Sequence, residues 1–560
     1  MEKQNRKEGK LSKLPVSVTQ FIKLIIKKMR YRKKVREEVE AELAAHFEDE
    51  LKGCKADAER EQKAEQLVGG FGDMKLLAVL LRRAKKRCRP LWRTVVARAF
   101  QTVGVLFICL VLYVVWFLTG KPVVTKDYIA EFNNLVRPVA DESLNAAPLY
   151  NKAIEVFEEL PRDISDVLGK IYYEVTEEDK QLIGKWLTDN EEVLDLVIAG
   201  TKRPYYWQHY EGEDMLSVLL PYLTEYRKLA FSFRWRIQLR AEQGRYEEAF
   251  SDIKTCYRFG RHVKGTKLVL IEQLVGIAIE AIAVENLRSI LSEYQIDSET
   301  LAMLQRDLEQ IMADEDFAMS FEGEKMFIYD EIQRCFTEDR FGGGHLYLTR
   351  IGQINSDGDE SAPTAQDIIL ESLSSLEGWG RAVKVLFFHP NKQQTREAAD
   401  RFYAYCETFA QKTPAQIRAE GIVMQKETMK IVGDNVFLSI LAPALGRACR
   451  IGHRQRTNVE ATITILALQR YKVDKDSFPA DLRQLITAGY LRQLPLDVYS
   501  DKPLVYKKTD DNFILYSVGE NIEDDGGKPG TDRGGRPRLW DDDGDSDAVF
   551  WPVPKSELNQ

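Results

Sequence analysis

The strongest constraint on this chain is an uninterrupted apolar segment, Ala99–Gly120. Of its 22 residues none is charged and 17 are apolar. A helix of this length is roughly 33 Å long, enough to cross a hydrocarbon core of about 30 Å. Tyr113 and Trp116 lie near its C-terminal end, where aromatic residues anchor membrane helices at the interface. The segment predicts a transmembrane helix, and the alternative is a buried helix of a soluble core.

Charge differs sharply between the two sides of this segment. Residues 1–98 hold 26 Lys and Arg against 14 Asp and Glu, whereas residues 99–560 hold 53 against 73. The positive-inside rule therefore places residues 1–98 in the cytoplasm and residues 121–560 outside it. The segment begins too far from Met1 for an ordinary cleaved signal peptide. We expect an uncleaved single-pass anchor in the cytoplasmic membrane.

The composition excludes several other classes of protein. With 44% hydrophobic and 30% charged residues the chain is globular, and 560 residues are too many for one core. Its 7 cysteines are too few for a disulfide scaffold and form no C-x-x-C pair, which argues against a zinc ribbon. Pairing of the cysteines beyond the span stays open, but a free buried thiol is expected for each. These cysteines are Cys256, Cys335, Cys406 and Cys449.

The region before the span (1–98) has the period of amphipathic helices. In residues 31–52 one face carries an apolar residue at every fourth position. A second helix is expected across residues 56–68, followed by a glycine turn and a helix that Asp73 caps. The apolar positions of the first helix are Val35, Val39, Leu43, Phe47 and Leu51.

The runs EEVEAELAAHFEDEL and GFGDMKLLAVLL resemble the HAAS domain, also called the permease-prefix domain. That resemblance implies a regulatory or partner-binding role ahead of a membrane segment and no catalysis. A generic three-helix head is the first alternative. A membrane anti-sigma factor is the second, although zinc-binding members use a H-x-x-x-C-x-x-C ligand set. Here His46 and Cys54 are eight residues apart.

Residues 121–455 predict a helical outer domain, either solenoid-like or a bundle. Within Leu229–Gly260 two helices are expected to meet at Gln243-Gly244-Arg245. This pair resembles a tetratricopeptide-type repeat, in which small residues allow close helix packing. A stripe of aromatic residues precedes and enters the pair, and it is either core or a ligand groove. Its members are Tyr205, Tyr206, Trp207, Tyr210, Tyr222, Tyr226, Phe231, Phe233 and Trp235.

Residues 456–560 predict a small α+β module. A helix ending near Tyr471 is followed by a short helix over Asp481–Ala488. Strands over Pro503–Lys507 and Asn512–Ser517 then form a hairpin. The runs ALQRYKVDKDSFP, YLRQLPLDVYSDKPLVY and FILYSVGENIEDDGG resemble the globular part of type II secretion pseudopilins. In pseudopilins an apolar helix directly precedes this module, whereas here the span lies far upstream, so we expect a borrowed domain.

An acidic, glycine-rich loop follows the hairpin. Four aspartates alternate along it, and oxygen ligands at every second residue of a bent loop suit Ca²⁺. The resemblance to pseudopilins also implies calcium in the corresponding loop. A solvated acidic loop is the alternative reading. The expected calcium ligands are Asp541, Asp543, Asp545 and Asp547, with Glu520 and Asp524 as further donors.

The sequence contains no nucleophile elbow, zinc-protease, dinucleotide or P-loop signature. The prediction is therefore a mainly α, single-pass protein of a bacterial inner membrane that acts as a non-enzymatic scaffold or sensor. The lipid bilayer and proteins on both sides of the membrane are its expected partners, with no nucleic acid. A link to a secretion-type assembly is expected from the pseudopilin-like module. The alternative is an extracytoplasmic hydrolase with its active site in the helical domain.

Overall fold

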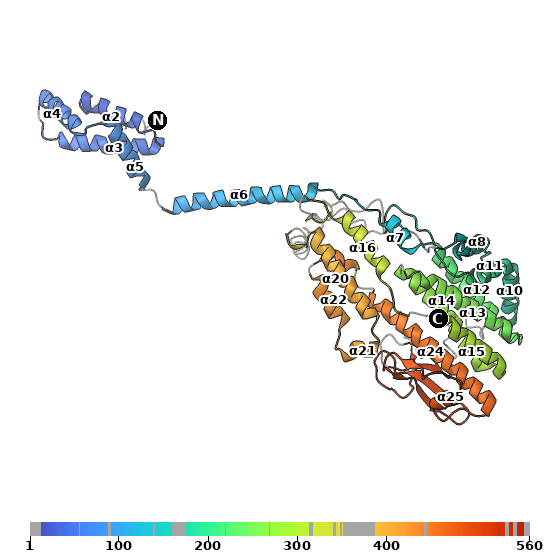
Figure 1. The fold of residues 1–560 in the computed structure, drawn as a ribbon. Coiled ribbons are helices and arrows are strands. Elements are labelled where there is room, and N and C mark those ends of the chain that lie inside the picture. Colours follow the sequence, from blue (N-terminus) through green and yellow to red (C-terminus); the bar gives the residue numbers. More distant parts are fainter. Residues whose placement is uncertain are drawn as a thin grey trace. The chain divides into compact units, whose positions relative to one another are not determined.

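The fold is mainly helical with a small sheet portion, as predicted (Figure 1). It separates into two compact units, Met1–Trp116 and Phe117–Gln560. The computed structural model describes residues 13–54, 56–87, 91–137, 140–159, 175–218, 220–267, 269–312, 317–339, 343–347, 350, 387–433, 435–441, 445–531, 537–540 and 546–553.

The first unit is a cluster of short helices before the apolar segment. The apolar face predicted from the four-residue spacing is confirmed, because Val39, Leu43, Phe47 and Leu51 are buried and Val35 is partly buried. The glycine turn is also confirmed, since Gly72 has a φ of 68°. The helices are α2 (Val16–Lys28), α3 (Lys33–Glu50), α4 (Asp57–Gly70) and α5 (Met74–Arg87).

Helix α2 was not predicted from the sequence, yet it supplies much of this core. Its side chains Phe21, Ile22 and Ile25 are buried, and the ring of Phe21 lies 6.0 Å from that of Phe47 and 5.6 Å from that of Phe71. Helix α2 packs on α3, α4 and α5. The head is therefore organised around α2 rather than around the three later helices alone.

The apolar segment forms one helix, α6 (Leu91–Thr119). It begins before Ala99, where the sequence analysis placed the start of the span. Its part Val95–Thr119 is 25 residues long and contains an 18-residue window with a mean hydropathy of 2.5, of which only 6% is buried. By length and composition it can cross a membrane. The last turn is covered, because the ring of Phe117 stacks on that of His345 with centroids 4.6 Å apart.

The second unit begins with short helices and continues with longer ones that pack in succession. Helix α13 packs on α12 and α14, and α24 packs on α14 and α15. These helices enclose one large core whose biggest fully buried side chain is Trp235. The helices are α7 (Tyr128–Val136), α8 (Ala147–Glu155), α10 (Glu177–Asp189), α11 (Glu191–Thr201), α12 (Tyr222–Glu242), α13 (Tyr246–Gly265), α14 (Leu270–Glu293) and α15 (Ser298–Met312).

Helices α12 and α13 form the predicted helix pair. Gly244 takes a φ of 73° in the turn between them, a conformation that glycine adopts without strain. The close helix packing expected from small residues occurs between α13 and α14. A Cβ on Gly276 of α14 would stand 2.4 Å from the Lys264 backbone nitrogen. A Cβ on Gly260 of α13 would stand 2.6 Å from the Gly276 carbonyl oxygen. The helix pair is confirmed, and its membership of the tetratricopeptide class stays a prediction.

A second core lies among the helices that follow α15. It joins α16 and α20 with the start of α24, and Phe321, Phe336, Phe402 and Phe437 are among its buried side chains. Its helices are α16 (Glu322–Cys335), α20 (Lys392–Ala410), α21 (Pro414–Ala419), α22 (Met424–Val432) and α23 (Val436–Leu441). The free buried thiols expected at Cys256, Cys335, Cys406 and Cys449 are confirmed.

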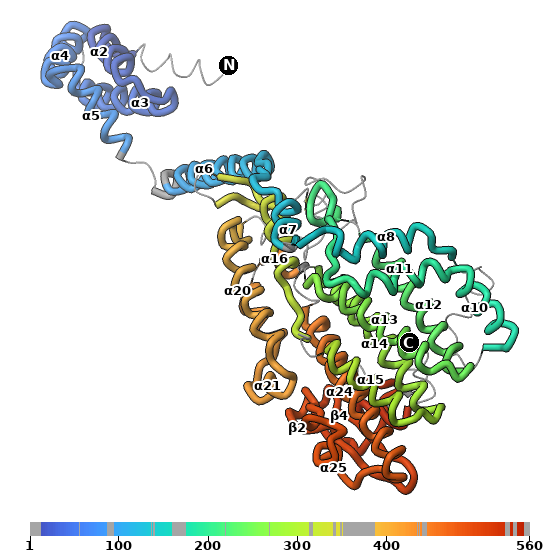
Figure 2. The backbone as a smooth tube through the Cα atoms, turned by 45° about the vertical axis from the view of Figure 1, so that its right-hand side comes forward, coloured from blue at the N-terminus to red at the C-terminus, as the bar shows by residue number. Residues whose placement is uncertain are grey.

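The C-terminal part contains the predicted helices and hairpin. Strands β3 (Val505–Lys508) and β4 (Phe513–Ser517) pair antiparallel, and β7 (Ala548–Trp551), which the sequence analysis missed, pairs with β4. Figure 2 shows β4 and α25 grouped at the lower end of α24. The other elements are α24 (Leu445–Lys475), α25 (Arg483–Thr487), β1 (Leu496–Asp497), β2 (Lys502–Pro503), β5 (Gly530–Thr531) and β6 (Pro537–Arg538).

The boundary predicted at residue 456 falls inside helix α24. One face of this helix packs on α14 and α15, and it also contacts β1, β4 and β7. The guanidinium of the fully buried Arg288 on α14 donates to the Thr462 hydroxyl at 3.0 Å. The helical region and the sheet therefore share one core rather than forming two separate domains.

Candidate functional site

The described donors of the expected calcium site engage other protein groups. The Glu520 carboxylate lies 2.8 Å from Arg454 Nε and 3.8 Å from Arg450 Nε. The Asp524 carboxylate accepts from the Tyr516 hydroxyl at 2.7 Å. The Glu520 carboxylate is therefore engaged by arginines of α24 and is not a free oxygen donor for a metal ion.

Asp547 is the buried member of this set. Its carboxylate accepts from the Gly527 N–H at 2.7 Å and the Asp525 N–H at 3.3 Å. Burial raises the pKa of Asp547, and the charges of Asp525 and Asp524 act in the same direction. In the described part of the chain no group of three or more His, Cys, Asp or Glu is placed to hold a metal ion. Asp541, Asp543 and Asp545 lie outside the described residues.

A cavity with a volume of about 630 Å³ lies among the described residues. It lies between helix α13 and the segment that follows α11. The i, i+3, i+4 spacing places Arg258, Arg261 and His262 on the cavity side of α13, while residues such as Phe250 and Ile253 are buried in the core. The lining residues are Thr201, Pro204, Tyr205, Tyr206, Trp207, Arg258, Arg261, His262, Gly265, Thr266, Gln310 and Ile311.

The segment opposite α13 is held by the buried side chain of Asn145. Its amide oxygen accepts from the Trp207 N–H at 2.9 Å, and its amide nitrogen donates to the Trp207 carbonyl at 2.8 Å. The Tyr205 carbonyl accepts from the Ala146 N–H at 2.9 Å. This clamp fixes the half-buried rings of Tyr205 and Trp207 at the cavity wall.

The cavity is basic although the chain beyond residue 98 is acidic. Arg258 is exposed and Arg261 half-buried, and within the residues that the structure describes neither forms an ion pair. The described lining contains no Asp or Glu side chain. Two uncompensated guanidinium groups beside aromatic faces favour an anionic ligand, because arginine binds carboxylates and phosphates through paired N–H donors.

His262 adds a polar group at the base of this cavity without adding charge. Its Nδ1 lies 2.7 Å from the buried hydroxyl of Tyr150. Burial, reinforced by the charges of Arg261 and Arg258, lowers the pKa of His262 to about 4. The imidazole is therefore neutral at physiological pH, and the arginines alone supply the positive charge.

A buried carboxylate network lies behind the cavity wall. Glu272 on α14 accepts from the Tyr222 hydroxyl at 2.6 Å, the Tyr210 hydroxyl at 2.7 Å and the Thr266 hydroxyl at 3.2 Å. Burial raises the pKa of Glu272, and these three hydrogen bonds oppose that effect. Because Thr266 also lines the cavity, it joins the wall to this network and fixes the C-terminal end of α13.

The aromatic stripe divides between the core and the wall of the cavity, and a role in ligand binding stays a prediction. Tyr210, Tyr226, Phe233 and Trp235 are buried in the cores, whereas Tyr205 and Trp207 line the cavity. The arginines of α13 were not singled out from the sequence. The sequence shows that they share a helix face. It does not show that no carboxylate of the described lining faces them, because that depends on tertiary contacts.

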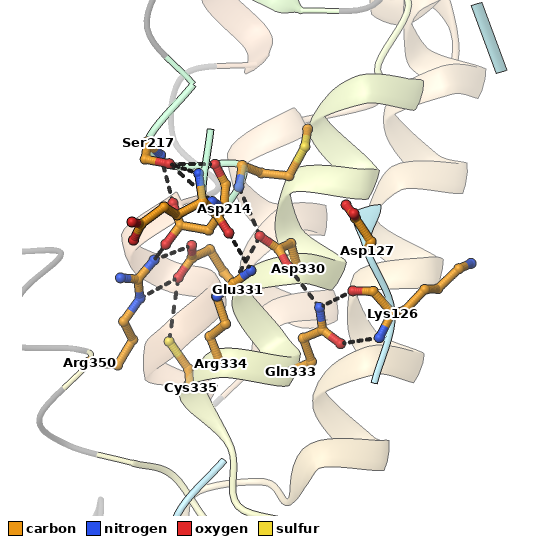
Figure 3. Close-up of polar contacts among 12 residues, drawn as sticks. Lys126, Asp127, Asp214, Ser217, Asp330, Glu331, Gln333, Arg334, Cys335 and Arg350 are labelled. Atoms are coloured by element: carbon orange, nitrogen blue, oxygen red, sulfur yellow. Dashed lines mark hydrogen bonds and ion pairs between the residues drawn. The ribbon is translucent and has the colours of Figure 1, made fainter. Parts of the chain in front are cut away.

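A second polar cluster joins distant segments and is satisfied internally (Figure 3). Arg350 Nη2 donates to Asp214 at 2.7 Å and to Glu331 at 2.8 Å. The buried Asp330 accepts from Arg334 Nε at 3.0 Å. Burial raises the pKa of Glu331. These carboxylates are paired with arginines, so the cluster ties residues 214–217 to α16 rather than presenting a binding surface.

Comparison with known proteins found no relative whose function could be considered for this chain. No protein-family model, curated protein or solved structure matches the chain. The basic cavity on α13, argued from its own residues, is thus the candidate functional site.

Proposed function

We propose that this chain is a single-pass membrane protein that works as a non-enzymatic scaffold or sensor and takes an anionic ligand in the cavity on α13. The observation that carries this proposal is the pair Arg258 and Arg261, unpaired within the described residues and facing a cavity without described carboxylates. A hydrolase of the predicted kind needs an acid or base at the reacting bond. His262 is a residue of that type in the described lining, and its Nδ1 is engaged by the Tyr150 hydroxyl at 2.7 Å. The carboxylate of Glu272 is fully buried behind Thr266.

The ligand that fits this wall carries a carboxylate or phosphate and a ring face. The anion binds the guanidinium groups of Arg258 and Arg261, and the ring packs on Tyr205 or Trp207. A volume of about 630 Å³ lies in the range of small-molecule sites. An acidic sugar or sugar phosphate has both features, and a neutral sugar has only the second.

Titration of the detergent-solubilised full chain with glucuronate and with glucose 6-phosphate is expected to give saturable heat by calorimetry. Glucose at the same concentrations is expected to give none. The variant with Arg258→Ala and Arg261→Ala is expected to bind either anion at least about 100-fold more weakly, because each charge-assisted hydrogen bond contributes roughly 1.5–3 kcal/mol.

Arg227→Ala is the matched control, because Arg227 is an exposed arginine of α12 that does not line the cavity. It is expected to bind both anions like the unaltered chain. Equal binding of glucose and glucuronate, or equal loss in the Arg227 variant, would remove the proposed site.

The other parts of the chain have proposed roles of their own. The HAAS-like helices α2–α5 bind cytoplasmic partners, and α6 anchors the chain in the bilayer. Support for a pseudopilin-like C-terminal module comes from its order, in which the long helix α24 precedes the β3–β4 hairpin and packs on β4 and β7. The carboxylate oxygens of Asp524 and Asp547 are the kind of ligand that calcium prefers, whereas the Glu520 carboxylate is paired with Arg454.

Calcium is expected to raise the melting temperature of the full chain, and EDTA is expected to reverse the rise. A ligand that binds only the folded state stabilises it by about 2.7 kcal/mol at 100 times its Kd. The variant with Asp541→Asn and Asp543→Asn is expected to lose the response. Asp510→Asn, in the exposed hairpin loop, is the control and is expected to keep it. A melting temperature that ignores calcium would exclude the metal.

A further inference from the structure

We infer that the second unit carries a surface that rests on the bilayer beside the end of α6 and binds anionic lipid headgroups. We call this surface the membrane-proximal patch. The inference rests on the proposed membrane anchoring by α6. The patch consists of the apolar residues Val123, Val124, Phe387 and Phe388 and the basic residues Lys126, Lys392 and Arg396.

The basic residues of the patch are brought together from two distant segments. Lys126 follows the span, whereas Lys392 and Arg396 lie in the first turns of α20, and all three line one cavity of about 380 Å³. Glu338 is the single acidic residue in its described lining. Lys126 also forms an ion pair with Glu131, and Lys392 Nζ lies 3.9 Å from the Glu338 carboxylate. Three basic side chains against these two carboxylates leave a net positive charge at the cavity, in a part of the chain where acidic residues outnumber basic ones.

A continuous set of contacts ties this cavity to the end of α6. Phe117 of α6 stacks on His345, and the His345 carbonyl accepts from the Thr337 N–H at 2.8 Å. The neighbouring Gly343 carbonyl accepts from the Lys392 N–H at 3.2 Å, which places the first residue of α20 against the same loop. A Cβ on Gly120 would lie 2.6 Å from Thr337, so the chain leaving the span is packed on this loop as well.

The chain after the span is also held at the cavity by contacts with Thr337 and Gln333. Pro122 pairs with Thr337 in an isolated β-bridge. The side-chain oxygen of Gln333 on α16 accepts from the Thr125 N–H at 3.1 Å and the Lys126 N–H at 3.2 Å. Lys126 is therefore held at the cavity rather than left on a free tether.

The apolar residues of the patch are exposed to solvent. Phe388 is 69% exposed, Phe387 47%, Val123 48% and Val124 50%. The ring of the adjacent His389 packs on Phe336 with centroids 5.7 Å apart, which fixes the backbone that presents Phe388. Exposed apolar side chains beside basic residues are typical of surfaces that enter the headgroup region.

The bilayer is the occupant that the distances favour. Thr119 ends the apolar helix and Thr125 already lines the cavity. Six residues span at most about 20 Å, so the cationic cavity stays within reach of the headgroup layer. Basic residues this close to a membrane attract anionic lipid.

Photo-crosslinking in nanodiscs tests this inference on the full chain. Benzoyl-phenylalanine in place of Phe388 is expected to form lipid adducts in discs of equal parts phosphatidylglycerol and phosphatidylcholine. The same probe at Val473, which is 50% exposed on the distant helix α24, is the matched control and is expected to form few. With Lys126→Ser, Lys392→Ser and Arg396→Ser combined, the ratio of phosphatidylglycerol to phosphatidylcholine adducts at position 388 is expected to fall roughly tenfold.

Equal lipid adducts at positions 388 and 473, protein adducts in place of lipid at 388, or an unchanged lipid ratio in the triple variant would overturn the inference. A probe at Leu106 in α6 separates this failure from a failure of the anchoring. Lipid adducts at 106 without adducts at 388 exclude the patch alone. Absence of lipid adducts at 106 excludes the anchor on which the patch rests.

Discussion

Division of the chain at residue 456 is expected to leave neither fragment able to fold. The fragment 456–560 would lose the partners of α24, and the fragment ending at Gln455 would expose the face of α14 and α15 that α24 covers. Buried apolar side chains on the removed part of α24 include Val459, Ile465 and Leu466. Each contributes about 1.5–3 kcal/mol, so the loss approaches the entire stability of about 5–15 kcal/mol.

Polar contacts across the same interface strengthen this expectation. The Gln305 amide on α15 donates to the Tyr490 carbonyl at 2.8 Å and accepts from Arg470 at 2.8 Å. Division would remove these two hydrogen bonds of Gln305 and the hydrogen bond from Arg288 to the Thr462 hydroxyl. The measurement is cooperative thermal unfolding by circular dichroism of each fragment and of their mixture.

The unbroken chain is the control for this experiment, and the mixed fragments are expected to recover part of its transition. A sharp, reversible transition in the isolated fragment 456–560 would show that the C-terminal module is autonomous. That outcome would support the resemblance to a self-contained pseudopilin domain and would contradict the shared core.

Local patterns in the sequence were sufficient to predict several of the individual elements, although helix α2 and strand β7 were missed. The four-residue spacing from Val35 to Leu51 predicted the buried face of α3, and the residues around Gly244 predicted the turn between α12 and α13. In the C-terminal part, the alternation around Thr509 predicted the β3–β4 hairpin. Each of these features depends on residues within a few positions of one another, so periodicity and turn chemistry specify it.

Features that depend on distant residues were not predictable in the same way. Strand β7 pairs with β4 across a long acidic loop, and nothing near Ala548 indicates its partner. The cavity on α13 needs the segment at Trp207, which Asn145 clamps. The arginines become a candidate site only because no carboxylate in the described lining faces them. Such information lies in tertiary packing rather than in any short run of residues.

Replacement of Asp252 by alanine is expected to destabilise the second unit by about 3–5 kcal/mol, because it breaks a buried ion pair from one side. Asp252 on α13 is 1% exposed and accepts from Arg236 Nε at 2.8 Å and from Arg240 Nη1 at 2.5 Å, both on α12. Arg236 is itself buried and would keep an uncompensated charge. The melting temperature of the full chain is expected to fall by roughly 5–10 °C.

Two further variants distinguish charge from packing in this result. Glu248→Ala removes an acidic residue of the same helix that lies 3.6 Å from Arg240 but is solvent-exposed, with 46% of its side chain accessible. It is expected to lower the melting temperature far less than Asp252→Ala does, because solvent-exposed ion pairs contribute little to stability. The double variant Asp252→Leu with Arg236→Met removes both buried charges and is expected to recover most of the stability, since an apolar pair of similar volume replaces an ion pair at little cost. If the double variant is as unstable as Asp252→Ala, the loss comes from packing and the buried charge is not its cause.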